Sequence, residues 1–228
     1  MSIIPKRAYE EIGHEAFGTN PVGTGPFEFD KWMTGDYIRL LKFKDYWKKG
    51  LPMVDEVIYK PMPDLFTKTQ ALLAGELDIV DTADYKDIAE LEKNPNLKPN
   101  RIDGWNFNFL SFRIDKLATP DLSPFQDVRV RQAVNYAVDR EEIAQAVYYG
   151  YARPTCLPLM PHDLGYTTKK YFPDRADITK AQRLLDDAGY GDGFETTVIT
   201  PSASALKREI EVIQAQLAKV NIKMNIDM

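Results

Sequence analysis

The sequence predicts an α/β protein built from two lobes. Two stretches, residues 57–80 and 195–226, have the order strand, helix, strand, with apolar residues at helical spacing between two short β-rich ends. Such a unit favours parallel strands joined by a right-handed crossover. Between these stretches, residues 117–124 contain two prolines and suit a linker. We therefore expect part of a first lobe over residues 1–112 and part of a second lobe over residues 113–228.

The first lobe is expected to open with a short helix and loop over residues 1–20, followed by a β-hairpin. The run Asn20-Pro21-Val22-Gly23-Thr24-Gly25-Pro26-Phe27 leads into it and predicts a rigid turn, because proline fixes φ and glycine allows positive φ. Strands are expected over residues 27–33 and 37–43, joined by Thr34-Gly35-Asp36. A phosphate loop is not expected, since Pro26 has no N–H and no Gly-Lys-Ser/Thr follows.

The first strand–helix–strand unit comes next. A strand over residues 57–59 precedes a helix that Asp64 can cap and Gly75 can end, and residues 77–80 are expected to form the second strand. Beyond this unit the sequence predicts a helix over residues 84–91 and strand-like stretches over residues 97–102 and 105–114.

The second lobe is expected to be mainly helical before its own strand–helix–strand unit. The apolar spacing and the capping residues predict its elements in order. They are a helix through Val130 and Val138, a helix capped by Asp139 with Glu142, an irregular stretch over residues 151–174, a helix from Asp177 to Gly189, a strand over residues 195–200, a helical stripe from Leu206 to Val220, and a strand over residues 222–226.

Composition indicates an ordinary globular protein and excludes several classes of partner. The 228 residues are 44% hydrophobic and 28% charged, with a net charge of −5. Acidic and basic residues are interleaved, so neither nucleic acid nor an anionic membrane is an expected partner. A lone Cys156 cannot form an internal disulfide, and the start of the chain lacks the apolar stretch of a signal peptide. Composition alone would indicate a cytosolic protein.

The sequence contains no pattern expected of a catalytic or metal site. His14-Glu15 is not a zinc motif, because position 18 is glycine, and His162 is the only other histidine. The acidic string at positions 78, 81, 84 and 87 lacks the glycine and glutamate of a calcium loop. No Gly-x-Ser-x-Gly element is present. Arg129 and Arg131 could suggest an anion site, but exposed positions on an amphipathic helix explain them better. We expect no enzyme activity, no cofactor and no metal.

Five blocks in order resemble the family 5 extracellular solute-binding proteins, the dipeptide, oligopeptide and nickel receptors of ABC importers. The fourth, Asp127-Val128-Arg129-Val130-Arg131-Gln132-Ala133-Val134-Asn135-Tyr136-Ala137-Val138-Asp139-Arg140, is nearly a consensus copy. One departure is Arg113, where the family usually has asparagine. The other blocks are residues 23–27, 45–57, 71–78 and 177–192.

The resemblance implies a periplasmic-binding-protein fold of type II, in which two lobes close on a ligand. It implies a substrate-binding component that delivers peptides to a membrane permease, and a periplasmic location for the full-length protein. A nickel-chelate, sugar or opine receptor of the same family is the alternative, and a peptide sensor or an α/β enzyme would be a different class. The resemblance further implies an internal fragment of a longer receptor, which could self-associate, and a hinge near residues 104–114.

Two regions are expected to contact the ligand. In the family, the strand after the glycine equivalent to Gly104 lines the cleft, so its aromatic rings could stack on the ligand and its amides could bond a peptide backbone. Packing in an interlobe core is the alternative for these aromatics. The candidates here are Trp105, Asn106, Phe107 and Asn108.

The second region is the loop before the last helix, with Ser202 and Ser204 as candidates. Ligands of open α/β sheets collect at the carboxyl ends of strands, and free N–H groups at a helix start favour a carboxylate. An ordinary helix-capping serine is the alternative.

Overall fold

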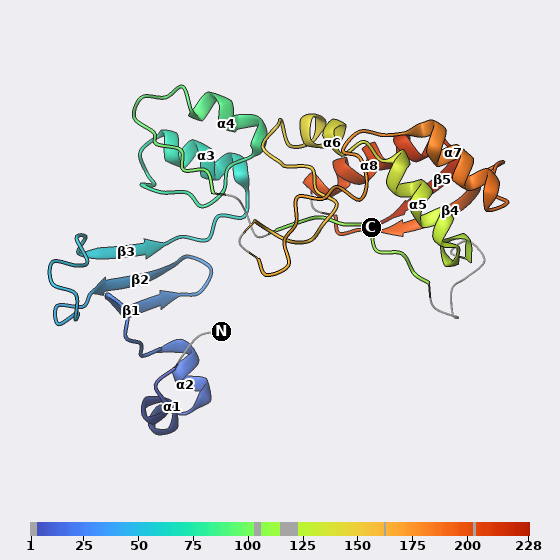
Figure 1. Cartoon of the computed structure of the whole chain (residues 1–228). Helices are drawn as coiled ribbons and strands as arrows, with labels where there is room; N and C mark the ends of the chain where they lie inside the picture. Colours follow the sequence, from blue (N-terminus) through green and yellow to red (C-terminus); the bar gives the residue numbers. More distant parts are fainter. Residues whose placement is uncertain (1–3, 103–105, 115–122, 162, 203) are drawn as a thin grey trace. The chain divides into compact units, whose positions relative to one another are not determined.

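The computed structural model describes residues 4–102, 106–114, 123–161, 163–202 and 204–228. The chain forms two compact units, Met1–Ala83 and Asp84–Met228. Figure 1 shows their helices and strands, coloured along the sequence. The expected lobe limits at residues 112 and 113 concern the lobes of a longer receptor, and they stay a prediction.

The first unit contains two short helices, a three-stranded antiparallel sheet and a further helix. The elements are α1 (Lys6–Ile12), α2 (His14–Thr19), β1 (Phe27–Met33), β2 (Tyr37–Lys42), β3 (Glu56–Tyr59) and α3 (Leu65–Leu73). β1 and β2 form the predicted hairpin, with Phe27 opposite Lys42. Asp64 caps α3 as predicted, because its Oδ1 accepts hydrogen bonds from the backbone N–H of Thr67 (2.8 Å) and from the Thr67 hydroxyl (2.6 Å).

The expected strand–helix–strand arrangement is wrong for the first unit. β3 pairs antiparallel with β2, with Val57 opposite Leu40, and residues 77–80 form no strand. A strand needs a neighbour for its N–H and C=O groups, and Ile79 in this segment is 85% exposed. The described residues of the stretches 97–102 and 105–114 form no strand either. Their β-propensity favours an extended chain but cannot supply the neighbouring strand.

The second unit contains the predicted helices and the predicted parallel strand pair. Its elements are α4 (Tyr85–Leu91), the short 3-10 helix η1 (Ser123–Gln126), α5 (Val128–Ala137), α6 (Arg140–Ala146), α7 (Ile178–Asp187), β4 (Phe194–Ile199), α8 (Ser204–Ala218) and β5 (Ile222–Asp227). Four helices begin after an aspartate whose side chain accepts a hydrogen bond from the first turn; these residues are Asp84, Asp127, Asp139 and Asp177. β4 and β5 pair in parallel across α8, which confirms the second strand–helix–strand unit.

Burial differs between the two units. Among the described residues of the first unit, only Phe17, Pro52, Thr69 and Ala71 are buried. The main hydrophobic core lies in the second unit, where α5, α6, α7, α8 and β5 contribute most of the buried side chains. Its centre includes Val130, Leu185, Val220 and Ile222, all fully buried.

A buried amide connects α8 to the turn between α5 and α6. Gln216 is 2% exposed, and its Oε1 accepts a hydrogen bond from the backbone N–H of Asp139 (3.1 Å). Its Nε2 donates to the carbonyl oxygen of Asp139 (3.2 Å) and to Oε2 of Glu142 (2.8 Å). Because Asp139 is also the cap of α6, this network fixes the start of α6 against α8.

Candidate ligand-binding site

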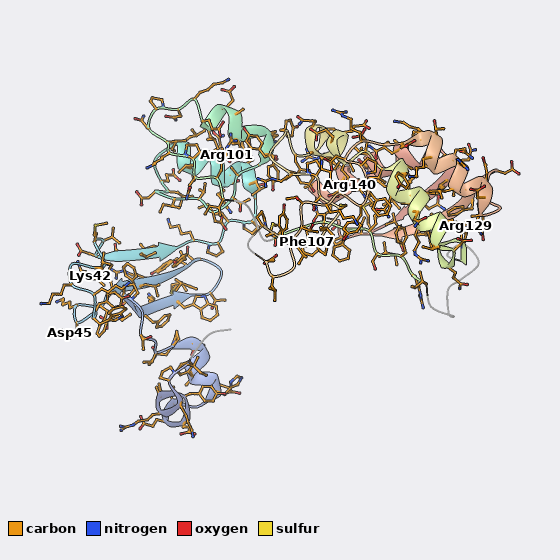
Figure 2. The ribbon with its side chains drawn as sticks, in the orientation of Figure 1. Lys42, Asp45, Arg101, Phe107, Arg129 and Arg140 are labelled. Atoms are coloured by element: carbon orange, nitrogen blue, oxygen red, sulfur yellow. The ribbon has the colours of Figure 1, made fainter. Side chains whose placement is uncertain are left out.

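Residues 106–114, the described part of the first predicted ligand region, lie on the second unit. Residues 106–109 are all exposed, and burial alternates over residues 109–112. Leu110 and Phe112 pack partly buried against the core, whereas Phe107 and Phe109 are 41% and 73% exposed. An alternation of period two is that of an extended chain, whose successive side chains point to opposite sides. Phe109 therefore stands on the side of the segment that faces away from the core, and Phe107, labelled in Figure 2, is exposed as well.

Asn108 is exposed, but its side chain takes part in a set of three mutual hydrogen bonds. Its Nδ2 donates to the hydroxyl of Tyr148 (2.7 Å) and to Oε2 of Glu209 (2.8 Å). The Tyr148 hydroxyl donates to the same Oε2 of Glu209 at 2.6 Å. We call these three residues the Asn108 clamp. Tyr148 follows α6 and Glu209 lies on α8, so the clamp connects the 106–114 segment to two helical elements of the same unit.

The environment of Tyr148 keeps its hydroxyl in the donating form. The side chain is 8% exposed, and the ring edge of Tyr85 lies against it with the ring centroids 5.3 Å apart. Burial raises the pKa of Tyr148, and its hydrogen bond to the Glu209 carboxylate raises the pKa further. The phenol therefore stays protonated at neutral pH and donates to Glu209.

Aromatic and cationic groups extend this environment. The ring of Tyr85 also stacks with that of Tyr151, at a centroid distance of 6.4 Å. The guanidinium of Arg101, labelled in Figure 2, lies 4.7 Å from the Tyr151 centroid and pairs with Glu92. These contacts give the Asn108 clamp a rigid aromatic support.

The clamp limits what Asn108 can offer a ligand. Its Nδ2 is already bonded to two protein acceptors, so Oδ1 is the atom of this side chain that a ligand can use. Phe107 and Phe109 offer apolar surface instead, with their ring centroids 5.6 Å apart. Phe109 was not among the predicted site residues. Asparagine and phenylalanine alternate over residues 106–109, and this sequence pattern could have identified Phe109 together with Phe107.

The other residues predicted to contact a ligand are either exposed or lie outside the described part of the chain. Asn106 and Ser202 are exposed. Trp105 lies outside the described residues, as does the side chain of Ser204. The two predicted regions are connected through α8, which starts just after the Ser202 loop and carries Glu209.

The two arginines considered for an anion site are bonded within the chain. Arg129, labelled in Figure 2, forms an ion pair with Asp127 at 2.6 Å and donates to the carbonyl oxygen of Asp187. Arg131 donates to the carbonyl oxygens of Phe125 (2.7 Å) and Gln126 (3.0 Å). These contacts favour a structural role for both side chains; Arg129 is exposed as expected, whereas Arg131 is half-buried.

Neither a metal site nor a membrane-spanning helix is found among the described residues. They contain no group of three or more His, Cys, Asp or Glu side chains placed to hold a metal ion. None of the helices in the described part is both long enough and apolar enough to cross a membrane.

Comparison with known proteins decides the family. The sequence model of the bacterial extracellular solute-binding proteins, family 5 (middle region), matches residues 1–228. The chain belongs to this family. Family 5 proteins bind peptides or other small solutes, work with ABC permeases and are periplasmic or extracellular. They are transport proteins and not enzymes.

Individual family 5 proteins support the assignment. The chain is 33% identical to the glutathione-binding protein GsiB of Escherichia coli O1:K1, over 99% of this chain and 42% of that protein. It resembles the structure of AppA from Clostridium difficile with a TM-score of 0.82 and 28% identity, over 98% of this chain and 46% of that one. For DppA from Helicobacter pylori, in complex with the peptide STSA, the TM-score is 0.72 and the identity 29%, over 99% of this chain and 43% of that one.

These likenesses confirm the type II periplasmic-binding-protein fold, of which this chain forms a part. The chain spans less than half the length of the curated family 5 relatives that it matches.

Proposed function

We propose that the whole protein is the solute-binding component of an ABC importer, and that it binds peptides in the periplasm. The observation that carries the proposal is the family 5 match over the full length of the chain, combined with solved relatives that hold peptides. In this proposal the protein acts without catalysis: two lobes close over the ligand, and the closed form delivers it to the permease.

The candidate site supplies the kinds of contact that a peptide needs. Phe107 and Phe109 offer apolar surface for a side chain, and the exposed amide of Asn106 can bond a peptide N–H or C=O. Oδ1 of Asn108 adds an acceptor. Trp105, directly before these residues in the sequence, and the loop around Ser202 complete the proposed set.

Glutathione is the second candidate, because GsiB of Escherichia coli O1:K1, which is 33% identical to this chain, is a glutathione-binding protein. Glutathione is itself a small peptide with two carboxylates, so the two candidates differ in charge and size and not in the kind of recognition. An opine receptor is a third candidate, since AgaA, solved in complex with agropinic acid, is 29% identical.

Two measurements test the proposal on the protein as its gene encodes it. Native mass spectrometry should detect a peptide-sized ligand that co-purifies with the protein. Calorimetry after removal of that ligand should then give saturable binding of tripeptides or of glutathione. Binding of neither, together with binding of an opine, would replace the peptide assignment.

A further inference from the structure

We infer that Glu209 binds a positively charged group of the ligand, so that the whole protein selects peptides that carry a lysine or arginine side chain. The inference rests on the proposed function and goes beyond it, because it names the charge of the preferred peptide and the residue that selects it.

The first step is the negative charge of Glu209, which no cation of the described residues neutralises. Its carboxylate accepts hydrogen bonds from two uncharged donors, Nδ2 of Asn108 at 2.8 Å and the Tyr148 hydroxyl at 2.6 Å. Both donors reach Oε2, and within the described part of the chain Oε1 has neither a hydrogen bond nor an ion pair. Glu209 is half-buried, and a carboxylate that is partly removed from water is more stable beside a cation.

The second step is that the Asn108 clamp does not itself require this charge. A glutamine at position 209 would offer a carbonyl oxygen, which accepts hydrogen bonds from an amide and a hydroxyl as a carboxylate oxygen does. The clamp holds the carboxylate in place, since Tyr148 is buried and the ring of Tyr85 packs against it. The chain therefore fixes a charged group where an uncharged one would complete the same hydrogen bonds. A carboxylate that is fixed before binding loses little conformational entropy when a cation reaches it.

The third step identifies the occupant, because the aromatic cluster beside the clamp already holds one cation. The guanidinium of Arg101 lies 4.7 Å from the centroid of the Tyr151 ring and forms an ion pair with Glu92. Tyr151 stacks on Tyr85, which in turn packs against the clamp. A carboxylate together with a tyrosine ring is thus the combination that binds a guanidinium in this chain. Glu209 offers the same two kinds of group, and its cation is left for a ligand to supply.

The fourth step connects this carboxylate to the ligand. Asn108 belongs to the first region predicted to contact a ligand, and α8, which carries Glu209, starts just after the second region around Ser202. Lysine and arginine side chains carry their charge at the end of a long stem, so they can reach a half-buried carboxylate while the peptide backbone stays outside. Their N–H groups form charge-assisted hydrogen bonds with carboxylate oxygens.

The test measures the affinity of the whole protein by calorimetry for two matched sets of tripeptides. Each peptide of the first set has one lysine and two alanines, and in the second set norleucine, which has the same carbon stem without the charge, replaces the lysine. The wild type should bind at least one lysine peptide about tenfold more tightly than its norleucine counterpart, and added salt should reduce this preference. Glu209→Gln should remove the preference by weakening lysine binding, and should leave norleucine binding unchanged.

Three further variants separate the charge from the hydrogen bonds. Tyr148→Phe removes one donor but keeps the Glu209 carboxylate, so it should retain most of the lysine preference. Glu209→Asp withdraws the carboxylate by one methylene group and should reduce the preference, and it serves as the test if Glu209→Gln does not fold. Glu211→Gln, at an exposed position on the same helix, is the matched control and should leave the preference unchanged. Thermal unfolding of each variant shows that the affinities belong to folded protein.

The possible failures are distinct. A wild type that binds neither set of peptides would overturn the proposed function and the inference with it. A wild type that binds both sets equally, or a Glu209→Gln variant that keeps the lysine preference, would overturn only the inference. Equal weakening of both sets by Glu209→Gln would also overturn it, and would assign Glu209 to a group that all the peptides share, such as the α-amino group.

Discussion

Nδ2 of Asn108 lies 2.8 Å from Oε2 of Glu209, a residue 101 positions later in the chain. This hydrogen bond connects a segment without regular secondary structure to the last helix of the second unit. It places the predicted ligand segment on a rigid support and leaves its two phenylalanine rings exposed. The same unit also contains features whose energetic roles can be tested separately from ligand binding.

Two glycines with the same backbone conformation should respond very differently to alanine. Gly189 and Gly193 have φ of +83° and +84°, but a Cβ at Gly189 meets nothing within 4 Å, whereas one at Gly193 would lie 1.9 Å from the carbonyl oxygen of Asn221. We expect Gly189→Ala to lower the free energy of unfolding by about 1 kcal/mol, and Gly193→Ala by about 3 kcal/mol more. Urea denaturation measures both, and equal losses would contradict the close approach.

Removal of the buried Gln216 amide should destabilise the second unit. Gln216→Ala leaves the N–H of Asp139 without its acceptor and opens a cavity between α6 and α8. We expect a loss of about 3 kcal/mol in the free energy of unfolding. Lys219→Ala, at an exposed position on the turn after α8, is the control and should change it by less than about 0.5 kcal/mol. A loss no larger than that of the control would show that water replaces the amide.

Asp127 should contribute to the acid sensitivity of folding. The hydrogen bonds from Arg129 lower the pKa of Asp127 from 3.8 to about 2. A lowered pKa in the folded state means that the stabilisation is complete above about pH 4 and is lost as the pH falls through about 2. Asp127→Asn, which can still cap α5, should therefore flatten the dependence of unfolding free energy on pH between 4 and 2. Arg129→Ala should flatten it as well, and an unchanged slope in both would show that the pair is not formed in solution.

We expect the chain of 228 residues to self-associate at high concentration. The β4–β5 sheet has two strands among the described residues, and each strand has one edge unpaired. Open strand edges recruit other chains through their free N–H and C=O groups. Sedimentation or light scattering over a concentration series measures the effect. A monomer at every concentration would show that these edges are protected.

Much of the helical structure could be predicted from the sequence because its determinants are local. Asp64, Asp139 and Asp177 cap the helices that were expected after them, since a cap needs only backbone N–H groups two or three residues away. The hairpin of β1 and β2 and the β4–α8–β5 unit follow from short turns and from periodicity in the same way.

The predictions that are wrong concern contacts between residues that lie far apart in the sequence. Residues 77–80 have the composition of a strand and form none, because pairing depends on a neighbour that composition does not reveal. In the candidate site, the sequence determined that aromatic and amide residues share one segment. Only the tertiary structure decided which of them bind the protein and which face outward, because Asn108 is held by Tyr148 and Glu209, and no local pattern specifies partners 40 and 101 residues away.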